Sequence, residues 1–178
     1  MTATQRVRES VKVWDPLLRV LHWSLAGSVL VAFVTGDEAM AVHVWAGLVA
    51  LGVVLTRVGW GVAGPRHARF ADFVPTPGEA LGHFRRLLRG EAVRHQGHNP
   101  AAGAMVIALL LMVLGVVASG LVAFDGNGAE LGEELHEALA WVLLGLIGLH
   151  VAGVVLSSLL EGQNLPLAML TGRKKPAP

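Results

Sequence analysis

The feature that most constrains the fold is a set of four long apolar stretches. They run over about 16–35, 41–60, 100–122 and 134–160. A helix rises 1.5 Å per residue, so roughly 20 apolar residues cross the hydrocarbon core of a bilayer. The chain is 53% hydrophobic and only 15% charged, with a mean hydropathy of +0.58. We therefore expect an all-α fold, an integral membrane four-helix bundle that forms a single domain over 1–178.

Two of the apolar stretches begin with a capping residue followed by proline. Asp15-Pro16 and Asn99-Pro100 place a side-chain acceptor before a proline at the first helical position. The first stretch has a rival interpretation as a cleaved signal peptide. It is long for a signal-peptide core, and three further spans follow, so the spanning helix is favoured.

The polar segment 61–98 contains no span, but it does contain a helix signal. Thr76-Pro77-Gly78-Glu79 reads as a capping box with proline at the first helical position, and the helix ends near Gly90. Apolar residues share one face of this helix, with arginines beside them: Leu81, Phe84 and Leu88, then Arg85, Arg86 and Arg89. That pattern indicates a short cytoplasmic helix lying in the membrane interface. A solvated cytoplasmic helix is the alternative.

The 14 lysines and arginines set the expected orientation. The first 19 residues hold four, the end of the second span with the middle segment holds seven, and the tail holds three. The other two loops hold none, and they carry several acids. Because cytoplasmic loops are enriched in basic residues, both termini are expected in the cytoplasm of a multi-pass inner-membrane protein. No basic surface interleaved with aromatic residues indicates nucleic-acid binding.

Histidine is the residue type that points to chemistry. The chain has no cysteine, which excludes disulfides, cysteine-ligated iron–sulfur clusters and c-type haem. Four of its eight histidines fall in polar sequence and are expected at the surface or in caps: His67, His83, His95 and His98. The other four lie within or at the ends of apolar spans: His22, His43, His136 and His150. Polar groups at membrane depth are costly and usually functional.

Depth decides which of these four histidines can meet. His136 and His150 are fourteen residues apart, about 21 Å along one helix and within roughly 40° of the same face. His22 lies near the cytoplasmic side with His150, and His43 lies near the outer side with His136. The spacing therefore predicts two bis-imidazole sites, one toward each membrane face.

A bis-imidazole site in a membrane favours haem over zinc. Zinc usually takes four protein ligands, whereas haem iron needs only two axial ligands from the protein. Small residues lie one turn from each histidine and would leave room for a flat cofactor: Ala26, Gly47, Ala140 and Gly153. Ordinary helix packing explains them equally well. Arg19, Arg57 and Arg69 are candidate partners for haem propionates, or simple positive-inside anchors.

Four segments of the chain resemble the bacterial cytochrome b561 family: WDPLLRVLHW, HVWAGLVALGVVLTRVGWGVAGPRHARF, GHNPAAG and HEALAWVLLGLIGLH. The resemblance extends from about Val11 to Arg173. It is greatest to the branch of the nickel–iron hydrogenase b-type cytochrome subunits. It implies a membrane bundle with two non-covalent haem b groups. Its ligands carry over as His22 with His150 and His43 with His136, and it implies a quinone near the cytoplasmic haem.

Three functions follow as hypotheses. The first is electron transfer across the inner membrane, through two b-type haems, between a periplasmic redox partner and the membrane quinone pool. The second makes the chain an enzyme, a superoxide:quinone oxidoreductase, although the acidic outer loops do not suit an anionic substrate. The third is a membrane anchor subunit of a hydrogenase-like complex. The sequence leaves the enzyme assignment open.

Overall fold

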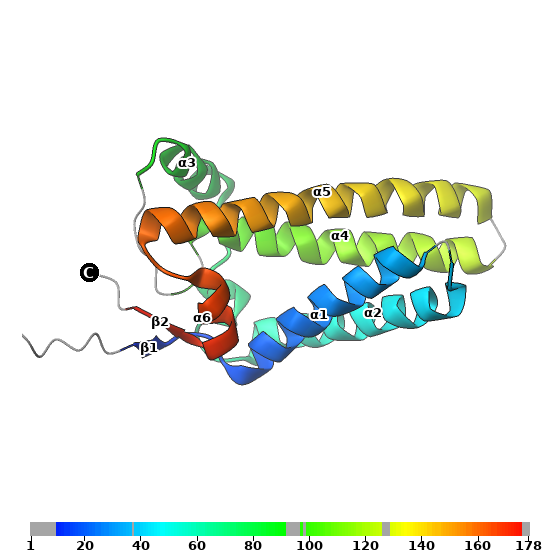
Figure 1. The fold of residues 1–178 in the computed structure, drawn as a ribbon, viewed down its shortest axis with the longest axis horizontal. Helices are drawn as coiled ribbons and strands as arrows, with labels where there is room; N and C mark the ends of the chain where they lie inside the picture. The colour runs from blue at the N-terminus through cyan, green and yellow to red at the C-terminus, as the bar shows by residue number, and fades with distance from the viewer. Residues whose placement is uncertain (1–9, 37, 92–96, 98, 126–128, 176–178) are drawn as a thin grey trace, which may run out of the picture.

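The computed structural model describes residues 10–36, 38–91, 97, 99–125 and 129–175. Six α-helices, a short 3-10 helix and two short strands make up the described chain (Figure 1). In chain order they are β1 (Val11–Lys12), α1 (Pro16–Thr35), α2 (Met40–Ala63), η2 (Phe70–Asp72), α3 (Pro77–Leu88), α4 (Pro100–Asp125), α5 (Ala129–Glu161), α6 (Leu165–Thr171) and β2 (Arg173–Lys174).

Four of these helices are long and apolar enough to cross a membrane, namely α1, α2, α4 and α5. They confirm the predicted all-α membrane bundle. The observed helices are longer than the predicted spans in three cases. The largest difference is at α5, which begins at Ala129 rather than Glu134. Its 33 residues give a length of about 50 Å, so α5 extends beyond the hydrocarbon core.

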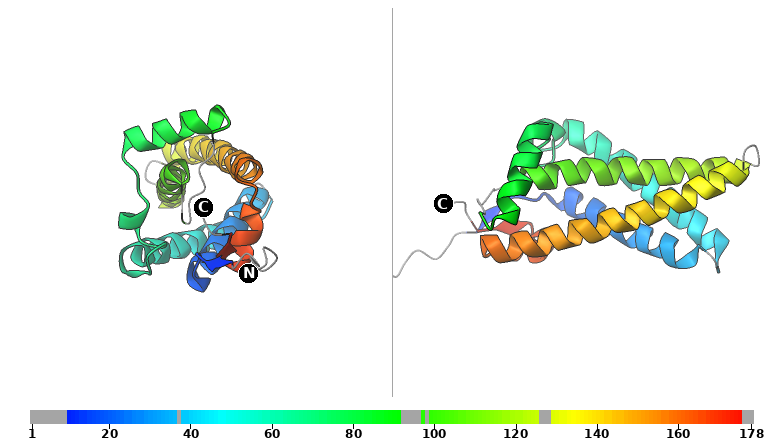
Figure 2. Two further views of the ribbon diagram at one scale, coloured as in Figure 1. Left: turned by 90° about the vertical axis from the view of Figure 1, so that its left-hand side faces the viewer. Right: turned by 90° about the horizontal axis from the view of Figure 1, so that it is seen from above.

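The four spans form two antiparallel hairpins that meet along one seam. α1 packs against α2, α4 packs against α5, and α2 packs against α4 (Figures 1 and 2). Because β1 pairs with β2, the described chain begins and ends at the same end of the bundle, beside α3 and α6. We call this the platform end. The opposite end, where α1 is joined to α2 and α4 to α5, is the hairpin end.

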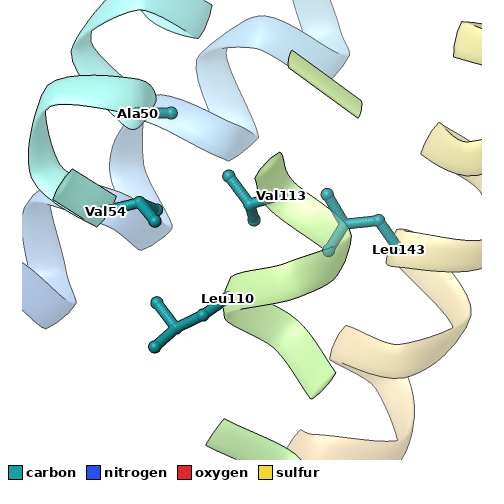
Figure 3. Packing of buried hydrophobic residues seen from close by; sticks show 5 residues of the cluster. All are labelled: Ala50, Val54, Leu110, Val113 and Leu143. Atoms are coloured by element: carbon teal, nitrogen blue, oxygen red, sulfur yellow. The ribbon is translucent and has the colours of Figure 1, made fainter. Parts of the chain in front are cut away.

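The buried core lies where the two hairpins meet. Ala50 and Val54 from α2 pack with Leu110 and Val113 from α4 and with Leu143 from α5 (Figure 3). These side chains interdigitate across three helices, which is the packing expected between close helices. The cluster therefore ties the two hairpins together at mid-bundle.

Large apolar side chains cover the outer faces of the spans. Leu30, Leu111 and Leu159 are exposed by 62%, 64% and 75% of their surface. A soluble protein seldom displays such a continuous apolar surface. Lipid chains, however, solvate it well, so these exposures agree with a bundle embedded in a bilayer.

The predicted helix starts are confirmed by their hydrogen bonds. Asp15 accepts from the backbone N–H of Leu18 at 3.0 Å, and Asn99 accepts from that of Ala102 at 2.8 Å. Each side chain satisfies a backbone donor that has no partner within its helix.

The predicted short helix exists as α3, and its capping box is formed. The Glu79 carboxylate accepts from the N–H and the hydroxyl of Thr76, both at 2.8 Å, and these bonds lower the pKa of Glu79. The prediction of a surface His83 was wrong, because this side chain is only 3% exposed. α3 packs against α4, and His83 is buried on this helix whereas Leu88 remains exposed. His95 and His98 lie outside the described residues.

Residues 11–14 and 172–174, at the two ends of the described chain, pair with each other at the platform end, and we call this contact the clasp. The carbonyl of Gly172 accepts from the N–H groups of Val13 at 2.8 Å and Trp14 at 3.2 Å. Beyond it, Lys174 lies over the Trp14 ring at 5.4 Å and donates to the carbonyl of Gly97 at 3.0 Å. Burial lowers the pKa of Lys174, and the charge of Glu161 opposes that shift. The clasp thus fixes the residues that lead into α1.

Gly172→Ala should weaken the clasp more than Gly90→Ala weakens α3. Both glycines have a left-handed φ, 79° and 75°, so each alanine costs roughly 1–2 kcal/mol in backbone strain. At Gly172 the new Cβ also meets the carbonyl oxygen of Trp14 at 2.8 Å, whereas none of the described residues approaches it within 4 Å at Gly90. Thermal unfolding in detergent should show the larger loss for Gly172→Ala. Equal losses would contradict the proposed packing.

Candidate functional site

The structure brings His22 and His150 together near the platform end. His22 lies on α1, two turns after its proline start, and His150 lies on α5. Their ring centres are 6.5 Å apart, with the ring planes inclined by 52°. Both side chains are half-buried.

His43 and His136 form a second pair near the hairpin end. His43 lies one turn into α2, and His136 lies two turns into α5. Their ring centres are 5.7 Å apart, and the planes are inclined by 76°. Together the two pairs reproduce the pairing predicted from depth, with α5 contributing one histidine to each.

Hydrogen bonds to backbone carbonyls orient both rings of the hairpin-end pair. His43 Nδ1 lies 2.7 Å from the carbonyl oxygen of Ala32, and His136 Nδ1 lies 2.8 Å from that of Val116. A carbonyl only accepts, so each Nδ1 carries the proton and donates it. In both rings Nε2 therefore carries the lone pair and is the nitrogen available to bind a metal.

Gly120 explains how the His136 ring reaches the backbone of α4. A Cβ added to this glycine would lie 2.9 Å from His136 Nδ1, a distance that requires the ring to move. Ser119 adds a longer contact to the same nitrogen, at 3.4 Å. The close approach of α5 to α4 thus depends on the missing side chain.

The platform-end pair has different surroundings. His22 Nδ1 is buried and has no hydrogen-bond partner among the described residues. Three residues before it, the guanidinium of Arg19 donates to the carbonyl of Leu170, while its Nε is buried with no partner in the described part of the chain.

Arg57 is a buried cation at the level of the platform-end pair. α2 and α5 run in the same direction, from the hairpin end to the platform end (Figure 1). Arg57 follows His43 by fourteen residues, as His150 follows His136, so Arg57 lies about 21 Å further along the same face of α2. Its side chain is 6% exposed and lies over the rings of Phe70 at 4.9 Å and Phe73 at 5.7 Å.

Neither terminal nitrogen of Arg57 has a hydrogen-bond partner among the described residues. Asp15 is the nearest opposing charge, and its carboxylate already accepts from Trp60 Nε1 at 3.2 Å. A buried cation with free donors favours an anionic ligand. Arg69, by contrast, is exposed and pairs with Asp72 at 3.0 Å, so it is engaged elsewhere.

Space remains beside both pairs. An added Cβ on Gly47, one turn after His43, would meet nothing within 4 Å in the described part of the chain, and the same holds for Gly153, three residues after His150. Leu143 lies seven residues from His136 and seven from His150, so the core packs against α5 between the two pairs. The described residues hold no cluster of three or more potential metal-ligating side chains.

Sequence reasoning missed the groups that act through the backbone. The carbonyls of Ala32 and Val116 have no side-chain signal, and their role appears only once the helices are packed. Phe70 and Phe73 lie in the segment between spans, and the sequence carries no signal that they would contact Arg57.

Comparison with known proteins gives a consistent result. Residues 13–172 match the family model described as prokaryotic cytochrome b561. A probable Ni/Fe-hydrogenase B-type cytochrome subunit of Bradyrhizobium diazoefficiens is 24% identical, covering 94% of this chain and 87% of the relative. A protein with the same description from Rhizobium leguminosarum bv. viciae is 23% identical, covering 94% and 90%. No solved structure matches.

The matched region contains all four spans and both histidine pairs. With four membrane helices, the match assigns the chain to the bacterial inner membrane as a multi-pass protein that transfers electrons and carries haem b. The chain belongs to the prokaryotic cytochrome b561 family.

Proposed function

We propose that the chain transfers electrons across the inner membrane by holding two haem b groups, one at each histidine pair. The observation that carries the proposal is the short distance between the two imidazole rings within each pair. Two imidazole nitrogens that share one iron at about 2 Å each put their ring centres roughly 6 Å apart. The observed separations of 6.5 and 5.7 Å fit that requirement.

His22 and His150 would hold the platform-end haem, and His43 and His136 the hairpin-end haem. When bound, haem b supplies a one-electron couple at its iron. The chain's own residues orient the ligands, exclude water and place fixed charges. Arg57 and Arg19 are suited to the propionates of the platform-end group, because both carry buried N–H donors without partners in the described chain.

The charge distribution supports an orientation with the platform end in the cytoplasm. All lysines and arginines of the described residues lie in segments that form this end, whereas the loops of the hairpin end have none in the sequence. In this orientation the hairpin-end pair lies toward the periplasm, near a donor protein. The platform-end pair then lies toward the cytoplasmic leaflet, where the membrane quinone is the proposed acceptor.

A hydrogenase-like complex is a second candidate for the donor. Both relatives are named as cytochrome subunits of Ni/Fe-hydrogenase, and the acidic hairpin end offers a surface for a partner of opposite charge. Hydrogen gas added to native membranes should reduce the chain's haem under this candidate. No reduction by hydrogen, with full reduction by dithionite, would exclude it.

Haem stoichiometry tests the proposal itself. The purified chain should contain two haem b groups by pyridine haemochrome assay. His150→Ala should retain only the hairpin-end haem, and His136→Ala only the platform-end haem, because each removes one of the two histidines that would hold that haem. His67→Ala, outside the spans, should retain both. Two haems in either of the first two variants would remove that histidine as a ligand.

The superoxide:quinone oxidoreductase alternative predicts a different result. An anionic substrate is repelled by outer loops that carry acids and no lysine or arginine. We expect the purified chain with quinone to consume superoxide no faster than a His136→Ala/His150→Ala double variant, measured by stopped-flow absorbance. Clearly faster consumption by the unaltered chain would favour the oxidase.

A further inference from the structure

We infer that the chain makes its two haem sites unequal, giving the platform-end site the higher reduction potential. This inference rests on the proposed binding of two haems and adds the residues that set the direction of electron flow. Two independent differences between the sites lead to it. One is the hydrogen bonding of the histidine pairs, and the other is the fixed charge around them.

Hydrogen bonding favours the oxidised state at the hairpin end. Both Nδ1–H groups there donate to carbonyls, from His43 to Ala32 at 2.7 Å and from His136 to Val116 at 2.8 Å. Such a bond raises the basicity of the coordinating nitrogen and so stabilises ferric iron. At the platform end, His22 Nδ1 is buried with no partner among the described residues, so this effect is missing from its ring.

Fixed charge favours the reduced state at the platform end. Arg57 and Arg19 lie at this level, with Asp15 as the opposing carboxylate. A buried cation stabilises the form that has gained an electron, because the interior screens the interaction weakly. The hairpin end has no lysine or arginine, and α5 begins there with exposed acids: Glu130, Glu133, Glu134 and Glu137. Their negative charge acts in the opposite direction.

Both differences have the same sign, so an electron is more stable at the platform end. The chain is thereby biased to accept electrons at the hairpin end and deliver them at the platform end. The residues that produce this bias are Arg57, Arg19 and the two backbone acceptors, rather than the four ligands, which are all histidine.

Redox titration of single-site variants tests the order of the two potentials. His43→Ala should leave only the platform-end haem, and His22→Ala only the hairpin-end haem. The midpoint potential of the first variant should be higher than that of the second. Equal potentials, or the reverse order, would overturn the inference. A chain that binds fewer than two haems before mutation would instead refute the proposed function.

Titration of the two-haem chain tests the assigned causes. Arg57→Gln should lower the higher of the two midpoint potentials and leave the lower one unchanged. Arg57→Lys keeps the charge, so its higher midpoint potential should stay close to that of the unaltered chain. Arg66→Gln removes an exposed arginine from the same end of the bundle and is the control for a solvent-screened charge. A change in the lower midpoint potential in Arg57→Gln would contradict the assignment of this cation to the platform-end site.

Gly120→Ala addresses the hydrogen bond at the other end. The alanine Cβ would displace His136 from the carbonyl of Val116, and this should raise the lower midpoint potential alone. Gly115→Ala is the matched control on the same helix, since its Cβ meets only Leu139 at an ordinary 3.7 Å. An unchanged lower midpoint potential in Gly120→Ala would show that this hydrogen bond does not lower the reduction potential of the hairpin-end site.

Discussion

Within a bilayer no water is available, so each polar side chain on a span must find its partner inside the protein. The histidines of the hairpin-end pair meet this constraint, whereas His22 Nδ1 at the platform end has no partner among the described residues. His43 and His136 each turn one nitrogen toward a backbone carbonyl of a neighbouring helix. The two rings lie with their centres 5.7 Å apart. The arrangement of the helices follows from this need as much as from apolar packing.

α5 is the element that both sites share. It carries His136 and His150 on one face, while Leu143 between them packs into the core that joins the two hairpins. The core therefore holds the two sites apart as well as holding the bundle together. α2 repeats the same fourteen-residue spacing with His43 and Arg57, so a histidine at the hairpin-end level is followed by a cation at the platform-end level. In the orientation and direction proposed above, moving an electron toward a negative interior costs about 2.3 kcal/mol per 100 mV, and a higher reduction potential at the platform-end site would offset part of that cost.

The spans, their capped starts and the two histidine pairs were accessible from sequence, because each has a dense local signal. A predominantly apolar stretch of 20 residues that starts at the Asp15-Pro16 cap predicts a helix, and the fourteen-residue spacing gives the relative depth of the histidines. The clasp was not accessible, since pairing of Val11–Lys12 with Arg173–Lys174 joins the two ends of the described chain. α6 did have a signal in Asn164 and Pro166, the same cap-then-proline pattern that marks α1. The buried position of His83 was missed because it depends on how α3 packs against α4.

The most direct measurement of the central claim is an anomalous difference map at the iron absorption edge, from crystals of the haem-loaded chain. The account predicts two iron peaks, one between His22 and His150 and one between His43 and His136, separated by roughly 20 Å as the rise of α5 requires. A single peak, or iron bound away from either pair, would contradict it.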